Sequence, residues 1–171
     1  FTVDTNLPII SGTVNGMAFS NGCYLSANTQ IEFDVIEDNL VNVTLNGIVI
    51  DDLRFLTDEL EEKEHTIIAI DKAGNTSSVS FIVDKTAPSF GLRDYYSAKD
   101  VILLSIVEKN FDRVTLDGAV TNITSWQGAE LPDGVHRIVA YDKAGNASSA
   151  SFVVDTKEPK ILLYKNGIVI T

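Results

Sequence analysis

An internal repeat constrains this chain more than any other feature of its 171 residues. The sequence Asp-Lys-Ala-Gly-Asn occupies residues 71–75 and returns at residues 142–146. At that constant offset, about 25 of the 58 positions from Ile31 to Pro88 are identical to those from Ile102 to Pro159, far above chance. The chain therefore contains two homologous units.

A Phe-x-Val-Asp sequence marks the end of each unit, because it occurs at Phe1, Phe81 and Phe152 and is followed each time by a proline. The tail after Pro159 matches the opening of the first unit, with Asn166-Gly167 on Asn15-Gly16, so we expect it outside the core of the second unit. The predicted organisation is the end of a preceding repeat at 1–7, domain 1 at 8–87, domain 2 at 88–158 and the start of a third repeat at 159–171.

The sequence pattern of each unit predicts an all-β fold. Residues 31–35 alternate apolar and polar, which predicts a strand with one buried face. Asn46-Gly47 separates two apolar runs, and Asp117-Gly118 takes its place in the second unit; such pairs favour tight hairpin turns. Gly74 and Gly145 are expected to adopt positive φ in their turns. Short strands with turns about every ten residues predict two tandem immunoglobulin-like Greek-key β-sandwiches.

The pattern resembles a known family. His65-x-Ile-x-Ala-x-Asp71-x-Ala-Gly-Asn75, followed by Phe81-x-Val-Asp84-x-Thr-Ala-Pro88, resembles the tandem bacterial Ig-like repeats of surface and secreted proteins. Domain 2 carries the same set, but ends Thr-Lys-Glu-Pro159 where domain 1 has Lys-Thr-Ala-Pro88. The resemblance implies modules of adhesins, cell-wall stalks and multidomain glycoside hydrolases, which act mostly as spacers and sometimes in binding.

Charge and hydropathy exclude several classes of function. The net charge is −11, whereas binding to nucleic acid or to an anionic membrane surface needs clustered Lys and Arg. The apolar runs, such as residues 101–104, are far shorter than the roughly 20 residues that span a bilayer. No signal-peptide pattern begins the chain, and we expect no nucleic-acid partner and no membrane insertion.

The residues with reactive side chains favour structural roles. His65 and His136 lie at equivalent positions of separate units and cannot share a metal ion; each is expected to bond back to the backbone, as a tyrosine often does there. Asp71 and Asp142 open tight turns and are expected to accept bonds from the following amides, with no second carboxylate recurring beside them. Cys23, the single cysteine, has no nearby His. We therefore predict no catalytic residue, no cofactor and no enzyme activity.

The residue pattern also disfavours metal sites and crosslinks. The acidic run 58–64 lacks the spacing of a calcium loop and contains Lys63, so it is expected to be a solvated face. Asp84 and Asp155 are better placed for calcium between domains, but Lys85 and Lys157 lie close by. Lys72 and Lys143 fall in exposed turns, the wrong place for a Lys–Asn isopeptide bond. We predict no bound metal.

The sequence thus predicts a non-catalytic, extracellular spacer or stalk module of a large bacterial surface or secreted protein. Its partners would be neighbouring domains of the same polypeptide. The short proline-containing junctions favour an elongated, semi-rigid array. The alternative is an adhesin-type or carbohydrate-binding module that recognises a glycan or a cell-surface protein through loops of domain 1. The additional nine or so residues before Ile31, with Met17, Phe19 and Tyr24, and Trp126 in domain 2 are its candidate contacts.

Overall fold

The computed structural model describes residues 3–165 and 168–170, with side chains up to residue 163. The chain folds into two compact units, each held together by contacts among its own residues. Unit 1 comprises Phe1–Ala87 with Asp142–Asn146, and unit 2 comprises Pro88–Tyr141 with Ala147–Thr171. The predicted domain boundaries and flanking repeats stay a prediction. Phe1, Thr2, Asn166 and Gly167, on which that frame partly depends, lie outside the described residues.

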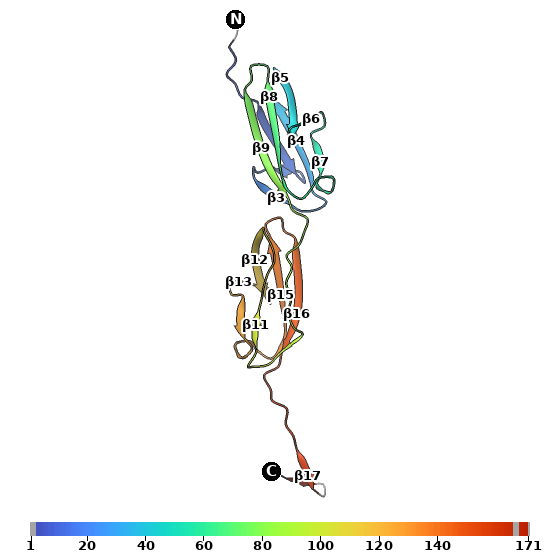
Figure 1. Cartoon of the computed structure of the whole chain (residues 1–171), viewed down its shortest axis with the longest axis vertical. Coiled ribbons are helices and arrows are strands. Elements are labelled where there is room, and N and C mark those ends of the chain that lie inside the picture. Colours follow the sequence, from blue (N-terminus) through green and yellow to red (C-terminus); the bar gives the residue numbers. More distant parts are fainter. Residues whose placement is uncertain (1–2, 166–167, 171) are drawn as a thin grey trace. The chain divides into compact units, whose positions relative to one another are not determined.

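Unit 1 is a sandwich of two sheets (Figure 1). One sheet has the strand order β2-β1-β4-β7 and the other β3-β9-β8-β5-β6. Neighbours that are distant in sequence, such as β1 beside β4 and β3 beside β9, give the crossed connections of an immunoglobulin-like Greek key. The strands are β1 (Ile9–Val14), β2 (Met17–Ala18), β3 (Cys23–Leu25), β4 (Gln30–Ile36), β5 (Leu40–Leu45), β6 (Ile48–Ile50), β7 (Arg54–Leu56), β8 (Glu64–Asp71) and β9 (Thr76–Val83), with the 3₁₀ turn η1 (Thr57–Glu59).

Unit 2 repeats this plan with a shorter first sheet. Its sheets are β11-β14 and β10-β16-β15-β12-β13. The strands are β10 (Tyr95–Tyr96), β11 (Val101–Leu103), β12 (Phe111–Leu116), β13 (Ala119–Thr121), β14 (Ser125–Gln127), β15 (Gly134–Asp142) and β16 (Ala147–Val154), with the 3₁₀ turn η2 (Gly128–Glu130). A last hairpin pairs β17 (Leu163–Lys165) with β18 (Ile168–Ile170). The prediction of an all-β, immunoglobulin-like fold is confirmed.

The hairpin turns follow from residues that tolerate positive φ. Asn46 and Gly47 have φ of 52° and 83°, and Asp117 and Gly118 have 51° and 84°. These values define the turn whose twist matches the flanking strands. Gly74 and Gly145 adopt φ of 89° and 88°, as predicted.

Each unit has its own apolar core between its sheets. Phe81 and Phe152, at matched positions of the last strand, are fully buried in the two cores. Trp126 is 7% exposed and belongs to the core of unit 2. Its ring is therefore not available to stack on a sugar. None of the helices in the described part of the chain is long and apolar enough to cross a membrane.

The additional residues of domain 1 form structure where a loop was expected. They extend β1 and build the β1–β2 hairpin, in which Thr13 pairs with Ala18 and Val14 with Met17. Met17 is exposed as predicted, but Phe19 is not free, because its ring packs edge-on against Phe33 with centroids 5.0 Å apart. The interpretation of this segment as an aromatic binding loop is therefore wrong for Phe19.

Candidate functional site

The turn between β8 and β9 is held by one buried carboxylate. Oδ1 of Asp71 accepts the amide hydrogens of Ala73 and Asn75, each at 2.8 Å, and Oδ2 accepts the Asn75 side-chain amide at 2.7 Å. Asp71 is only 2% exposed. Its role is therefore to organise the turn, as the sequence predicts, and the same bonds link Asp142 to the amide and side chain of Asn146 at 2.9 and 2.7 Å.

The asparagine that ends each turn also binds a second segment. Nδ2 of Asn75 donates to the carbonyl oxygen of Asp4 at 3.2 Å, and Nδ2 of Asn146 donates to the carbonyl oxygen of Asp84 at 2.8 Å. Both contacts fall within unit 1. Asp4 and Asp84 are equivalent residues, because each ends a Phe-x-Val-Asp sequence. The repeated turn therefore binds the chain at the point where the preceding Phe-x-Val-Asp sequence ends. We call these bonds, from Asn75 to Asp4 and from Asn146 to Asp84, the clasp. Sequence reasoning missed this role.

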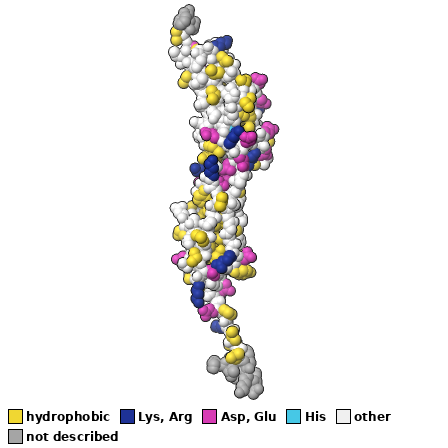
Figure 2. All heavy atoms as spheres, viewed as in Figure 1, with side chains coloured by type: hydrophobic (Ala, Val, Ile, Leu, Met, Phe, Trp, Pro, Cys, Tyr) yellow, Lys and Arg dark blue, Asp and Glu magenta, His cyan; other side chains and the backbone are white. Residues whose placement is uncertain are grey.

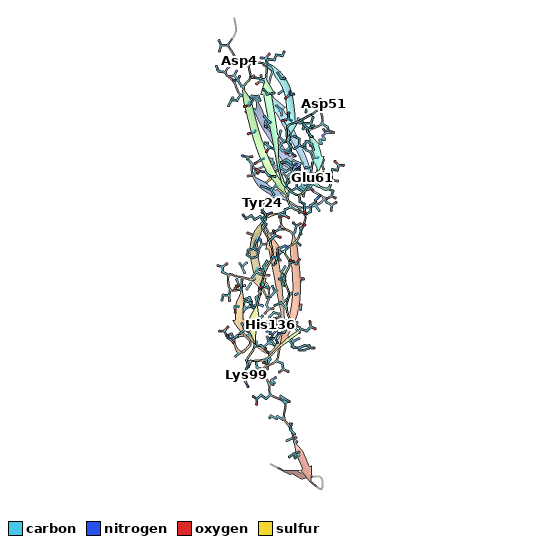
Figure 3. All side chains as sticks on the ribbon, viewed as in Figure 1. Asp4, Tyr24, Asp51, Glu61, Lys99 and His136 are labelled. Carbon is cyan, nitrogen blue, oxygen red and sulfur yellow. The ribbon has the colours of Figure 1, made fainter. Side chains whose placement is uncertain are left out.

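Two further carboxylates lie beside Asp71, but within the described residues no such group forms at Asp142, so a second carboxylate does not recur in both units. One oxygen each of Asp4, Glu37 and Asp71 lie within 4.8 Å of one another, and Asp4 is labelled in Figure 3. Burial acts to raise the pKa of Asp71, but the bonds from Asn75, Ala73 and Gly74 outweigh it and hold that pKa below its ordinary value. The amide donors therefore favour the ionised form of this carboxylate.

Backbone amides also satisfy the neighbours of Asp71. Oδ1 of Asp4 accepts the amide of Asn6 at 3.1 Å, and Oε1 of Glu37 accepts the amide of Asn39 at 2.9 Å. We expect calcium to leave the melting temperature of the chain unchanged relative to chelator, because these oxygens have already exchanged water for amide donors. Calorimetry with calcium and then with chelator measures this. A calcium-dependent rise of several degrees would show that the cluster binds the ion.

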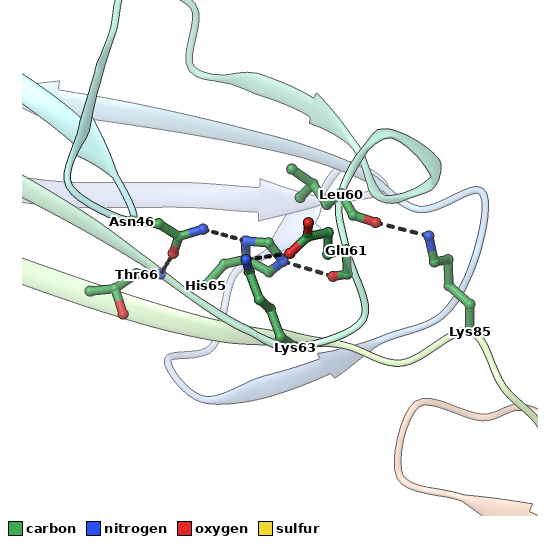
Figure 4. Close-up of polar contacts among 7 residues, drawn as sticks. All are labelled: Asn46, Leu60, Glu61, Lys63, His65, Thr66 and Lys85. Atoms are coloured by element: carbon green, nitrogen blue, oxygen red, sulfur yellow. Dashed lines mark hydrogen bonds and ion pairs between the residues drawn. The ribbon is translucent and has the colours of Figure 1, made fainter.

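His65 in unit 1 is a buried cross-brace (Figure 4). The Thr66 amide donates to Oδ1 of Asn46 at 3.0 Å, which leaves Nδ2 of Asn46 to donate to Nδ1 of His65 at 2.9 Å. Nε2–H of His65 then donates to the carbonyl of Glu61 at 2.9 Å. The ring stacks on Phe81 with centroids 5.3 Å apart. In this arrangement Nδ1 accepts a hydrogen bond and Nε2 donates one.

His136 in unit 2 (labelled in Figure 3) is the equivalent residue, and its Nδ1 has a different partner. Nδ1 faces Oδ2 of Asp117 at 2.7 Å and Nε2 faces the carbonyl of Pro132 at 2.8 Å, so both nitrogens donate. Burial acts to lower the pKa of His136, but the Pro132 carbonyl and the Asp117 carboxylate raise it above its ordinary value overall. Each histidine thus bonds back to the backbone as predicted, and the two differ in the partner of Nδ1, which is Asn46 for His65 and Asp117 for His136.

The other candidate side chains offer little chemistry. Cys23 is half-buried, and burial raises the pKa of its thiol despite bonds from the backbone, which disfavours the reactive thiolate. Lys72 and Lys143 are exposed in their turns, as predicted.

A polar hollow of about 610 Å³ lies on unit 1. It is lined by β1, β4 and the connection from β6 to β7, including Ser11, Thr13, Glu32, Asp34, Asp51 and Arg54. Arg54 pairs with Glu32 at 2.9 Å, whereas Asp34 and Asp51 have no hydrogen-bond or ion-pair partner within the described residues. Figure 2 shows acidic side chains on the side of unit 1 where β6 and β7 lie. The hollow offers acceptors to hydroxyl groups or cations.

No family model matches the sequence, and no curated protein matches it. Among solved structures, the chain is similar to SGBP-B of the Bacteroides ovatus mixed-linkage glucan utilization locus, solved with a mixed-linkage heptasaccharide, at 13% identity and a TM-score of 0.32, over 87% of this chain and 60% of that one. It is similar to murine CEACAM1b at 9% identity and a TM-score of 0.42, over 87% of this chain and all of that one.

A third similar structure is the N-terminal four Ig domains of Dscam1 isoform 1.9, at 12% identity and a TM-score of 0.34, over 88% of this chain and 38% of that one. The chain therefore spans less than two thirds of the SGBP-B and Dscam1 chains that it matches. These likenesses are distant, and the immunoglobulin-like assignment rests on the strand order of the chain itself.

Proposed function

We propose that this chain is a non-catalytic, extracellular tandem Ig-like spacer or stalk module of a large bacterial surface or secreted protein. The observation that carries the proposal is the clasp that Asn75 and Asn146 make on Asp4 and Asp84. A module whose work is to hold its neighbours in series needs a recurring bond at the end of each closing strand. It needs no reactive centre, and the two turn aspartates and the two histidines are engaged in structural hydrogen bonds.

The clasp restricts the chain by fixing a backbone group. A carbonyl held by a side-chain amide loses the rotational freedom of the residues around it, and the proline that follows each Phe-x-Val-Asp sequence fixes φ a few residues later. Both devices use neutral groups. The restraint should therefore be insensitive to salt and to divalent ions, unlike a junction held by calcium or by exposed ion pairs.

Small-angle scattering of the wild-type chain and of Asn146→Ala tests the proposal. We expect the variant to need a broader distribution of shapes than the wild-type chain, because the Asp84 carbonyl loses its donor. Asn122→Ala is the matched control, since Asn122 is exposed and makes no hydrogen bond within the described residues. A compact wild-type particle, or identical curves for wild type and Asn146→Ala, would refute the spacer role of the clasp.

The polar hollow on unit 1 favours one second candidate, an adhesin-type or carbohydrate-binding accessory module. Asp34 and Asp51 present carboxylate oxygens that can accept sugar hydroxyls. Screening the chain against a glycan array, with Asp34→Asn and Asp51→Asn as paired variants, tests it. Binding that both substitutions abolish would support this function, and an array without signal would leave the spacer as the better proposal.

A further inference from the structure

Unit 2 lacks a strand that unit 1 possesses. In unit 1, β1 runs antiparallel to β4 over six residue pairs, from Ile9 opposite Ile36 to Val14 opposite Ile31. In unit 2, the described chain keeps only the first of these contacts, the bridge between Ser89 and Val107. After Ser89 the chain crosses to the other sheet of unit 2, where β10 pairs with β16. The edge of β11 that corresponds to the β1 side of β4 is therefore open.

Three residues present their backbone groups to this open edge. The Leu104 amide donates to the carbonyl of Thr124, and the Asp100 carbonyl accepts from Gly128, so these two residues and Ile102 between them face β14. Backbone direction alternates along a strand. The amides and carbonyls of the intervening residues, Val101, Leu103 and Ser105, therefore face outward.

The exposed side chains of β11 are also apolar, which favours the binding of another strand. Val101 and Leu103 are 49% and 60% exposed, whereas Gln30 and Glu32 hold the equivalent positions in unit 1. Natural sheets protect open edges with prolines, charges or bulges. Residues 101–105 contain none of these, so this apolar edge has the features of a strand acceptor.

The chain itself carries the missing strand. In the repeat frame, residues 161–165 correspond to Ile10–Val14 of β1. The hairpin of β17 and β18 has the register of β1 and β2, because Tyr164 pairs with Val169 and Lys165 with Ile168, as Thr13 pairs with Ala18 and Val14 with Met17. Residues 159–171 also carry two lysines and no acidic residue on a chain of net charge −11. This basic segment is attracted to the acidic remainder of a second copy.

One substitution pair makes room for the added strand. A Cβ on Gly12 of β1 would lie 2.8 Å from the Phe33 ring and 2.7 Å from the Glu32 carbonyl. The residue equivalent to Gly12 in the tail is Leu163, and the residue equivalent to Phe33 in unit 2 is Leu104. Loss of the ring removes the side-chain conflict, and the added strand must lie slightly farther from the Leu103 carbonyl than β1 lies from that of Glu32.

We propose that β17 of a second copy adds antiparallel to the β11 edge of unit 2, in the register that β1 uses on β4. Leu163 then lies opposite Leu104 and Leu162 opposite Ser105. The donor hairpin brings its own outer strand, β18. Two chains that exchange tails in this way close into a symmetric pair, and exchange that fails to close gives open chains of copies.

Sedimentation velocity of the full chain over a wide concentration range tests the proposal. We expect association that weakens about tenfold or more when residues 160–171 are deleted, and equally when Ser105→Pro blocks the acceptor edge. Ser125→Pro is the matched control, because the Ser125 amide faces away from β11 on the opposite edge of the same sheet. It should leave association unchanged. Trp126 fluorescence checks that unit 2 stays folded in each variant, since this tryptophan is in its core.

Mixing the two defective chains separates donor from acceptor. The Ser105→Pro chain keeps its tail and the deleted chain keeps its edge, so each alone should be monomeric and the mixture should form heterodimers. Association that Ser105→Pro abolishes but tail deletion preserves would overturn the proposal in favour of β11 pairing with β11. A wild-type chain that is monomeric at every concentration, or a mixture that stays monomeric, would overturn it outright. None of these outcomes depends on the spacer role.

Discussion

Gly128→Ala should lower the free energy of unfolding of unit 2 by about 3 kcal/mol, the upper part of the range for overpacking a buried site. A Cβ on Gly128 would lie 2.0 Å from the carbonyl oxygen of Ser97 and 2.9 Å from its carbon. These are backbone atoms, so no side-chain rotation relieves the conflict. The loop that precedes β11 must move away from η2, and the bond from the Gly128 amide to Asp100 is then lost.

Urea unfolding followed by tryptophan fluorescence measures this effect for unit 2 alone, because Trp126 is the single tryptophan and lies in that core. Gly91→Ala is the control, since no atom lies within 4 Å of a Cβ there. A loss for Gly128→Ala no greater than for Gly91→Ala would show that the loop relaxes without cost.

Asp117→Asn should remove a pH dependence that only unit 2 possesses. The raised pKa of His136 contributes stability that is complete below the unfolded value of about 6.5 and is lost as pH rises through the folded pKa. Burial acts to raise the pKa of Asp117, but the Arg137 amide and His136 lower it overall, so its contribution is lost as pH falls through that lowered value. The pair therefore stabilises unit 2 most between about pH 4 and 6.5.

An asparagine at position 117 recreates the arrangement of unit 1, in which Asn46 donates to the histidine. His136 should become neutral, its pKa should fall, and the stability of unit 2 should stop declining above neutral pH. The chain has two histidines, so an NMR titration resolves both rings, and His65 serves as the internal control. Identical titration of His136 in wild type and variant would contradict the assignment of the imidazolium to the Asp117 contact.

The fold was predictable because its signals are local. Asn46-Gly47 and Asp117-Gly118 specify their turns through the conformations those residues tolerate, and the strand alternation around them specifies the buried faces. Because the chain contains two homologous units, each turn pair and each alternating strand occurs twice, which strengthened the prediction. The structural roles of Asp71 and the two histidines followed from the same logic, since their partners lie within a few residues or on the adjacent hairpin.

What escaped prediction depends on contacts between segments far apart in sequence. Glu37 approaches Asp71 because the turn after β4 packs beside the turn after β8, and no spacing rule joins those positions. The close approach of Ser97 to Gly128 could not be predicted from the repeat, because unit 1 has different contacts at the matched positions, Ser26 and Thr57. There, the Thr57 hydroxyl donates to the carbonyl of Ser26 at 2.7 Å and accepts the amide of Thr29 at 2.9 Å. The open β11 edge likewise follows from residues that are missing.

The clasp also sets how the chain should respond to mechanical force. Nδ2 of Asn75 donates both to Asp71 and to the carbonyl of Asp4. A pull on the segment before β1 is therefore transmitted to the turn between β8 and β9, the most extensively paired hairpin of unit 1. A load on that turn pulls β8 and β9 in the same direction, so it does not shear the bonds between these two strands. It is resisted by the bonds of β8 to β5 and of β9 to β3. Under tension, the bond to Asp4 should break first, lengthening the linker before either strand yields.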